Sequence, residues 1–203
     1  MQVGPVLIVD DAQAKPTDSG GQLFRADRGS RKGDAVNVLA LERPPATQVP
    51  LSGRGSEYHL LGPRTAGALP AVDVLGIHYA KVKPERREEF ERFVAERIHP
   101  AVANLRPDLR ILYYKATRGP DAGNYIALFA LTKASRDKYW PKGADSDELR
   151  AAFSPPVRAL TKELSTYLVE GSYAADPKLA AAVYESREWT DFVLISPRTV
   201  PTK

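Results

Sequence analysis

The sequence of 203 residues contains no cysteine. This absence excludes disulfide bonds, thiolate nucleophiles, iron–sulfur clusters and zinc sites that use cysteine ligands. Histidine is also scarce, with only His59, His78 and His99 in the whole chain. A metal site built from several imidazoles is therefore not expected, and we predict no metal and no cofactor.

Runs of charge of one sign are missing too. The formal net charge is +4, from 29 Lys and Arg against 25 Asp and Glu, and no five or six basic residues follow one another. Between residues 85 and 97, arginines alternate with glutamates, which is typical of a solvated helix face. Because a nucleic-acid binder usually gathers its cations on a patch or stripe, we predict no nucleic-acid partner.

Long hydrophobic runs are absent as well. The first ten residues hold only a brief apolar run and no basic region, and no segment approaches the roughly 20 apolar residues of a membrane span. We therefore expect a protein of the cytoplasm with no membrane partner, and leave open a leader that is removed. A hydrophobic fraction of 43% is sufficient to build a core.

Residues 1–70 differ from the rest of the chain. They contain two short apolar runs, Val6–Val9 and Val36–Leu41, and then a stretch up to residue 70 that is dense in proline and glycine. Both residue types interrupt regular structure. This pattern predicts an irregular extension with one or two short strands, which is too thin to form a core of its own.

The first apolar run ends in Asp10 and Asp11, an order that resembles the first strand and acidic pair of a response-regulator receiver domain. Two carboxylates at the end of a strand could help to hold Mg²⁺. A buried strand followed by an Asp-rich turn is common, however, and the later run leads into Glu42-Arg43-Pro44 rather than into an acceptor aspartate. We interpret this segment as a strand and a turn, and keep a phosphoryl-acceptor role as a remote alternative.

Residues 71–175 predict an α+β domain with the order β-α-β-β-α-β, the ferredoxin-like arrangement of an antiparallel sheet with helices on one face. The expected strands alternate or are rich in Ile, Leu and Tyr, and the expected helices show helical spacing of apolar residues. Pro100 should kink or break the first helix, and Pro155-Pro156 should interrupt the second helical region. The expected strands are 72–82, 109–117, 125–132 and 166–173. The expected first helical region runs to about residue 105 from a turn at 83–85, and the second covers 135–140 and, after an acidic insert, 147–164.

The first of these strands places Leu75, Ile77 and Tyr79 on one face and His78 on the other. The first face is too apolar to be left in water. We expect it to be covered either by a second sheet from another chain, which would make a dimeric barrel, or by extra segments of this chain. Residues 176–203 are expected to form a tail with a short helix at Pro177–Glu185 and a strand at Phe192–Ile195.

The run from Ile77 to Phe90, IHYAKVKPERREEF, resembles the opening of the dimeric α/β-barrel superfamily. This superfamily includes antibiotic-biosynthesis monooxygenases, heme-degrading monooxygenases and stress-responsive barrel proteins. Their first strand typically ends in V-K-P-G before a helix that carries E-E-F, and here the corresponding residues are Val82-Lys83-Pro84-Glu85 and Glu88-Glu89-Phe90. The resemblance covers about half of the chain. It implies a homodimer with a barrel fold.

In the oxygenase members, a pocket between the sheet and its helices holds a polycyclic substrate whose own carbanion reacts with O₂. The resemblance places His78 where a polar residue of the first strand points into that pocket, and Trp140 where a tryptophan lines it. His78 would then orient or deprotonate a phenol, with a free-imidazole pKa that suits the task. The tyrosines that would supply ring surface and hydroxyl donors are Tyr113, Tyr114, Tyr125 and Tyr139.

The same residues have structural interpretations. A single histidine on a strand is often a hydrogen-bonded core residue, and tyrosines favour strands for packing alone. Heme-degrading relatives take their iron ligand from a histidine shortly beyond the tryptophan, but this chain has none after His99, so a role of that kind is not expected.

Two hypotheses follow. The first is a protein that binds a small apolar or aromatic ligand, with a cofactor-independent oxygenase or isomerase on an aromatic or polyketide-like compound as its catalytic version. The second is a non-catalytic barrel whose function is association, with residues 1–70 as a clasp or a partner-binding arm.

Overall fold

The computed structural model describes residues 4–11, 21–29, 31–62, 72–102, 105–141, 145–169 and 189–196. The strands are β1 (Val6–Asp11), β2 (Gln22–Gly29), β3 (Ala35–Leu41), β4 (Ser56–Leu60), β5 (Val74–Ala80), β6 (Arg110–Arg118), β7 (Tyr125–Leu131) and β8 (Trp189–Ser196). The α-helices are α1 (Arg87–Phe93), α2 (His99–Val102), α3 (Lys133–Tyr139), α4 (Asp147–Ala152) and α5 (Pro155–Ser165). A 3₁₀ turn at Pro84–Arg86 leads into α1, and a π-helical turn at Val94–Ile98 joins α1 to α2.

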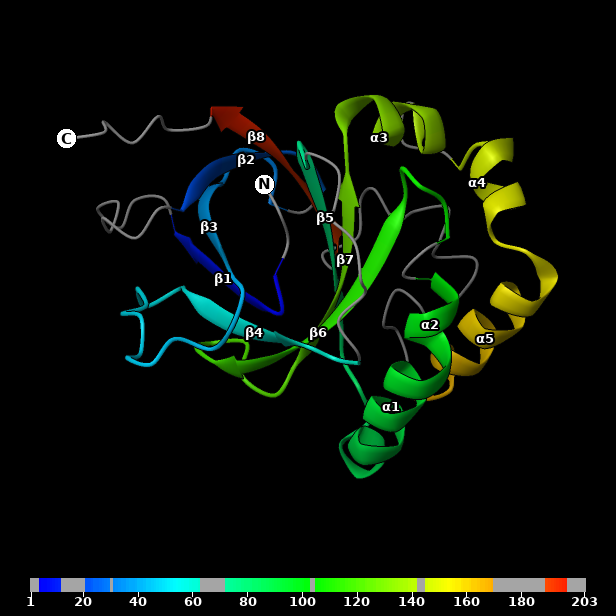
Figure 1. Ribbon diagram of the computed structural model, residues 1–203, viewed down its shortest axis with the longest axis horizontal. Coiled ribbons are helices and arrows are strands. Elements are labelled where there is room, and N and C mark those ends of the chain that lie inside the picture. The colour runs from blue at the N-terminus through cyan, green and yellow to red at the C-terminus, as the bar shows by residue number, and fades with distance from the viewer. Residues whose placement is uncertain are drawn as a thin grey trace.

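The strands form a closed barrel in the order β1-β3-β2-β8-β5-β7-β6-β4, and every neighbouring pair is antiparallel. The helices gather on one side of this barrel, beside β5, β7 and β6, while β1, β2 and β3 form the opposite wall (Figure 1). The predicted α+β class with an antiparallel sheet is therefore confirmed. In the described part of the chain, no helix is long and apolar enough to cross a membrane.

The barrel interior is a filled hydrophobic core. Leu75 and Ile77 of β5 point into it, as the alternation of that strand predicts, and both are buried. They meet Leu7 of β1 and Phe24 of β2, which come from the N-terminal extension. Burial of each such side chain contributes about 1.5–3 kcal/mol. The apolar face that had to be covered is thus covered by extra segments of the same chain.

The extension contains more regular structure than its sequence predicts. Residues 6–60 form four strands, β1 to β4, instead of one or two short ones. The strands that the sequence analysis missed, β2 and β4, are mostly polar, and only alternate residues such as Phe24, Ala26 and Tyr58 face the interior. A strand that closes a barrel needs apolar residues at every second position only, and such a strand has no continuous apolar run that would identify it in the sequence.

The strand expected at residues 166–173 is not found in its described part. After α5 ends at Ser165, Thr166 and Tyr167 form a turn through backbone bonds to Glu163 and Leu164. The only pairing described for residues 166–169 is an isolated bridge from Leu168 to Val82. The neighbour of β5 on that side is β8, which includes the strand predicted at 192–195. Residues 170–173 and the helix expected at 177–185 lie outside the described residues.

Pro100 interrupts the regular α-helix at the position where the sequence predicts a kink. The backbone before it widens into the π-helical turn, in which the amide of His99 donates to the carbonyl of Val94. Proline has no amide to donate, and a wider turn lets the chain continue past it into α2. Pro155 stands in the first turn of α5, where its missing amide costs nothing, so the predicted interruption is the start of a new helix.

Candidate functional site

A cavity of about 510 Å³ lies between the sheet and the helices. Its sheet wall comes from the outward faces of β5, β6 and β7, and its other walls come from α1, α2, α5 and the segments around α5. The residues that line it are His78, Tyr79, Ala80, Phe90, Val102, Ile111, Tyr113, Ala127, Phe129, Phe153, Arg158, Thr161, Lys162, Leu164, Ser165 and Leu168.

The cavity exists because small residues stand on the sheet wall. Strand register places His78 of β5 directly opposite Ala127 of β7, and Ala80 lines the same space. A methyl group at these positions fills far less volume than the phenylalanine or isoleucine side chains beside them. The result is a hollow whose lining consists mainly of aliphatic and aromatic groups.

His78 lies on the sheet wall and is 8% exposed. Its ring is tilted by 30° against that of Phe129, with 4.5 Å between the ring centroids. Burial lowers the pKa of His78 to about 3, because the charged imidazolium would lose its hydration there. The side chain is therefore a neutral imidazole at physiological pH, with one ring nitrogen that donates and one that accepts.

The cavity's charged residues come from α5. Arg158 and Lys162 are spaced one helical turn apart and are exposed to solvent, with the hydroxyl groups of Thr161 and Ser165 on the same side of the helix. The described lining contains no aspartate or glutamate. The site thus combines a neutral polar group on the sheet with two cations on the helix.

Trp140 and Tyr139 stand behind the cavity wall and do not line it. Trp140 packs edge-on against Phe129, with 5.6 Å between ring centroids, so it supports the ring that contacts His78. Tyr139 is buried in a separate apolar cluster, and its hydroxyl donates to Asp108 at 2.6 Å. Burial and then the neighbouring carboxylate of Asp108 raise the pKa of Tyr139.

The strand tyrosines divide according to the face on which they lie. Tyr113 lines the cavity. Tyr114, one residue later, points into the barrel interior, where its hydroxyl donates to the carbonyl of Gly4 at 2.9 Å and burial raises its pKa. Tyr125 faces the helices but donates to Glu91 at 2.6 Å and does not line the cavity. Of the predicted site residues, the structure brings His78 and Tyr113 together and places the others around or away from them.

Sequence reasoning missed the helical wall of the site. Arg158, Thr161, Lys162 and Ser165 follow a helical spacing of three and four residues, which the sequence shows as a polar stripe of an amphipathic helix. Such a stripe is usually solvated, and nothing in one sequence indicates that a cavity opens beside it. The small residues Ala80 and Ala127 give no signal either, since alanine is common in any strand.

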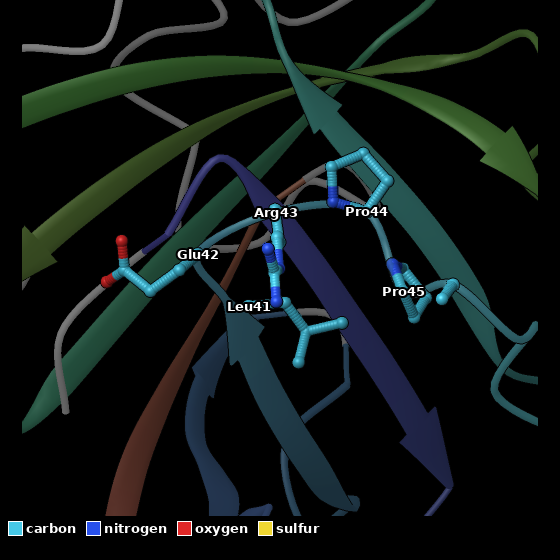
Figure 2. Close-up of a pocket in the computed structure, with 6 residues that line it drawn as sticks. Leu41, Glu42, Arg43, Pro44 and Pro45 are labelled. Carbon is cyan, nitrogen blue, oxygen red and sulfur yellow. The ribbon is translucent and has the colours of Figure 1, made fainter.

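A second hollow, of about 590 Å³, lies where the chain leaves β3 (Figure 2). It is lined by residues 41–46, and most of these side chains are exposed, including Glu42, Arg43 and Pro44. Because a single exposed loop forms it, this hollow excludes little water and positions no buried polar group. The cavity at His78 is the better candidate site.

Asp10 has a structural part in the fold. Its carboxylate accepts hydrogen bonds from the backbone amide of Ser52 at 2.9 Å and from the Ser52 hydroxyl, and it lies against Gly55. These contacts fasten the end of β1 to the loop before β4. The strand itself pairs antiparallel with β3 and β4, unlike the parallel sheet of a receiver domain. The side chain of Asp11 lies outside what the structure describes.

No protein-family model and no curated protein matches the chain. Among solved structures, it is similar to a heme-degrading enzyme from Listeria monocytogenes, with 11% identity over 93% of this chain and 98% of that one and a TM-score of 0.46. A putative monooxygenase from Fusobacterium nucleatum has 10% identity over 97% and 94% of the two chains and a TM-score of 0.47. An anthrone oxidase-like protein has 12% identity over 94% and 90%, with a TM-score of 0.48.

These similar structures belong to the heme-degrading and monooxygenase-like groups that the sequence resemblance names. Identities of 10–12% and these TM-scores assign neither an activity nor a ligand to this chain. The chemistry of its site has to be argued from its own residues.

Proposed function

We propose that this protein binds a small apolar molecule in the cavity between its sheet and its helices. The observation that carries the proposal is the cavity itself, because its volume of about 510 Å³ lies within the range of known ligand pockets, roughly 300–1,000 Å³. Its lining is dominated by apolar and aromatic side chains, with few polar groups. Such a surface favours the transfer of an apolar ligand from water.

His78 fixes the orientation of the ligand in this proposal. Its neutral ring exchanges a hydrogen bond with one polar group of the ligand, and Phe129 holds the plane of the ring. A role as the base that deprotonates a phenol is disfavoured. A phenol has a pKa of about 10, so proton transfer to an imidazole of much lower pKa would be strongly uphill.

The catalytic version of the proposal is a cofactor-independent oxygenase or isomerase that acts on an aromatic or polyketide-like substrate. The rings of Phe90, Tyr113 and Phe129 support it, since they offer the surface on which a flat substrate stacks. The apolar walls keep the reacting carbon away from bulk water.

Association of copies is a separate proposal. The homodimer that the resemblance implies stays a prediction, and sedimentation velocity on the purified chain would test it. A sheet from a partner chain is not needed to cover the apolar face of β5, β6 and β7, because β1 to β4 of the same chain cover it. In the alternative of a non-catalytic barrel, the strands within residues 1–70 act as a clasp that closes the barrel of their own chain.

The cavity can be tested by filling it. Ala127→Leu adds three carbon atoms beside His78, so we expect the neutral fluorescent probe N-phenyl-1-naphthylamine to bind about tenfold more weakly than it binds the unaltered protein. Ala159→Leu makes the same change at an exposed position of α5 and should leave binding unchanged. Equal affinity of both variants and the unaltered protein, or no binding to the unaltered protein, would contradict the proposal.

A further inference from the structure

Arg158 and Lys162 give the cavity a positive rim that a purely apolar ligand does not need. Both line the cavity from α5, and their spacing of four residues puts them on the same side of that helix. Thr161 and Ser165 alternate with them at the same rim. This inference rests on the proposed function, since it names the kind of molecule that the cavity binds.

The guanidinium of Arg158 is held in place by the backbone. Its Nη1 donates to the carbonyl oxygen of Phe153 at 2.6 Å and to that of Arg150 at 3.2 Å. Phe153 itself lines the cavity, so these bonds keep the cation beside the opening. Within the described residues, Nε and Nη2 of Arg158 make no hydrogen bond, which leaves donors available to a ligand.

Among the described residues, no acidic side chain lines the rim beside these cations. Lys162 forms no ion pair with any described residue. The adjacent Glu163 bonds to Arg97 at 2.5 Å and does not line the cavity. Opposite the rim, His78 is neutral. The described lining therefore carries two positive charges and no negative charge at the opening, above an apolar interior.

We propose that the ligand is an amphipathic carboxylate. Its apolar body occupies the cavity that His78 and Phe129 line together, and its carboxylate lies at the rim beside Arg158 and Lys162. Arginine matches the two oxygens of a carboxylate with a planar pair of donors, and lysine adds a mobile point charge. The body is either an aromatic ring system or an alkyl chain, because both are apolar and both can enter a cavity of this volume.

Two matched pairs of ligands test the charge separately from the apolar body. They are 2-naphthoate with 2-naphthamide, and dodecanoate with dodecanamide, each titrated by calorimetry at low salt. We expect the unaltered protein to bind at least one carboxylate about five- to tenfold more tightly than its amide, as expected for two solvent-exposed charges. A preference in the naphthyl pair identifies aromatic ligands, and one in the dodecyl pair identifies fatty acids. Added salt should reduce either preference.

The variants locate the charge effect. Arg158→Gln combined with Lys162→Gln should abolish the preference for the carboxylate over the amide. Lys162→Gln alone disturbs no side-chain hydrogen bond of the described residues and should reduce the preference about twofold. Lys32→Gln, in the exposed turn between β2 and β3, removes the same charge far from α5 and should change nothing.

Two kinds of result would overturn the inference. If carboxylate and amide bind the unaltered protein equally, or if the preference survives in the double variant, the rim does not select a charge, although binding in the cavity stands. If neither member of any pair binds and the neutral probe does not bind either, the proposed function fails together with the inference.

Discussion

At the scale of single residues, burial decides the chemistry of the site. His78 and His99 are both buried, and burial lowers the pKa of each. His59 is half-buried and bonds to Glu57 at 2.8 Å on the outer face of β4. The same residue type thus has different roles at different depths. The sequence shows where the imidazoles are, and only the fold shows which one borders a cavity.

His78 should make the protein sensitive to acid. Its pKa of about 3 in the folded chain lies below the roughly 6.5 of an exposed histidine, so the unfolded chain binds a proton that the folded chain refuses. The contribution of neutral His78 to the free energy of unfolding is therefore fully present above about pH 6.5. It falls as the pH drops towards 3, by at most about 1.4 kcal/mol per pH unit.

His78→Gln removes this contribution. The difference in unfolding free energy between the unaltered protein and the variant should shrink or reverse between about pH 7 and pH 5, in favour of the variant. Urea denaturation followed by circular dichroism at both pH values measures it. Parallel loss of stability in the two proteins would show that His78 can protonate in the folded chain.

Asp191 of β8 should have the opposite pH dependence. It is 2% exposed, its Oδ2 has no hydrogen-bond partner among the described residues, and burial raises its pKa to about 7. The nearby Arg136 opposes that shift only in part, because it bonds to Asp27 at 2.7 Å and to Asp137 at 3.2 Å. The stability that belongs to the protonated carboxyl is present below about pH 4 and is lost as the pH rises through 7.

Asp191→Asn keeps the size of the side chain and removes the ionisation. We expect this variant to gain stability over the unaltered protein as the pH is raised from about 4.5 to about 7.5, by at most about 1.4 kcal/mol per pH unit. Denaturation curves at several pH values within that interval measure the difference. A variant that loses stability at the higher pH would mean that the Asp191 carboxylate is stabilised by a partner.

At the scale of elements, turns and close approaches set the geometry of the barrel. Gly119 and Gly123 lie in the connection between β6 and β7, and both have a positive φ, of 94° and 85°. A Cβ atom at Gly119 would lie 2.1 Å from the carbonyl oxygen of Gly55, which is backbone and cannot move aside easily. At Gly123 it would meet only the flexible guanidinium of Arg87, at 3.6 Å or more.

These two glycines provide a matched pair of substitutions. Gly123→Ala should cost about 1–2 kcal/mol of unfolding free energy, the usual cost of a left-handed conformation. Gly119→Ala adds a backbone clash to the same conformational cost and should lose about 3 kcal/mol or more. Chemical denaturation of both variants measures the difference. Equal losses would mean that the loop before β4 moves away from the β6–β7 turn at little cost.

The elements of the second half were largely predictable because each has a local cause. The alternation in β5 indicated which face would be buried, and the prolines at 100 and 155 indicated where helices would change course. No local feature of the sequence indicated that β8, and not residues 166–173, would be the neighbour of β5. Both segments have strand-like composition, and pairing across a sheet depends on contacts between segments that are distant in the sequence.

At the scale of the whole molecule, the extension and the second half form one barrel. Strands β1 and β4 connect β3 to β6, and β2 pairs with β8, so both edges of the second-half sheet are occupied by the first 60 residues. Paired edges prevent the open backbone groups of a strand from recruiting another chain. The interior core also combines side chains from both halves.

Deletion of residues 1–70 tests this dependence. The shortened chain would expose Leu75, Ile77 and the other inward side chains of β5, β6 and β7, together with the free edges of β6 and β8. We expect it to aggregate, or to associate into dimers that rebuild a barrel between copies. Sedimentation velocity and near-ultraviolet circular dichroism would show the difference. A stable monomer with a native spectrum would contradict the view that β1 to β4 form half of the core.

The sequence by itself excluded disulfide bonds and cysteine-ligated metal sites, because it contains no cysteine. It also determined the α+β class, the antiparallel sheet and the face of β5 that is buried, because periodicity and helix- or strand-breaking residues act over a few residues. The tertiary structure alone decided that strands of the same chain close the barrel and that alanines on two strands leave a cavity in front of His78. It also decided that a polar stripe of α5 becomes the rim of that cavity. These features depend on which distant segments meet, and the free energy of such meetings comes from packing that no local pattern records.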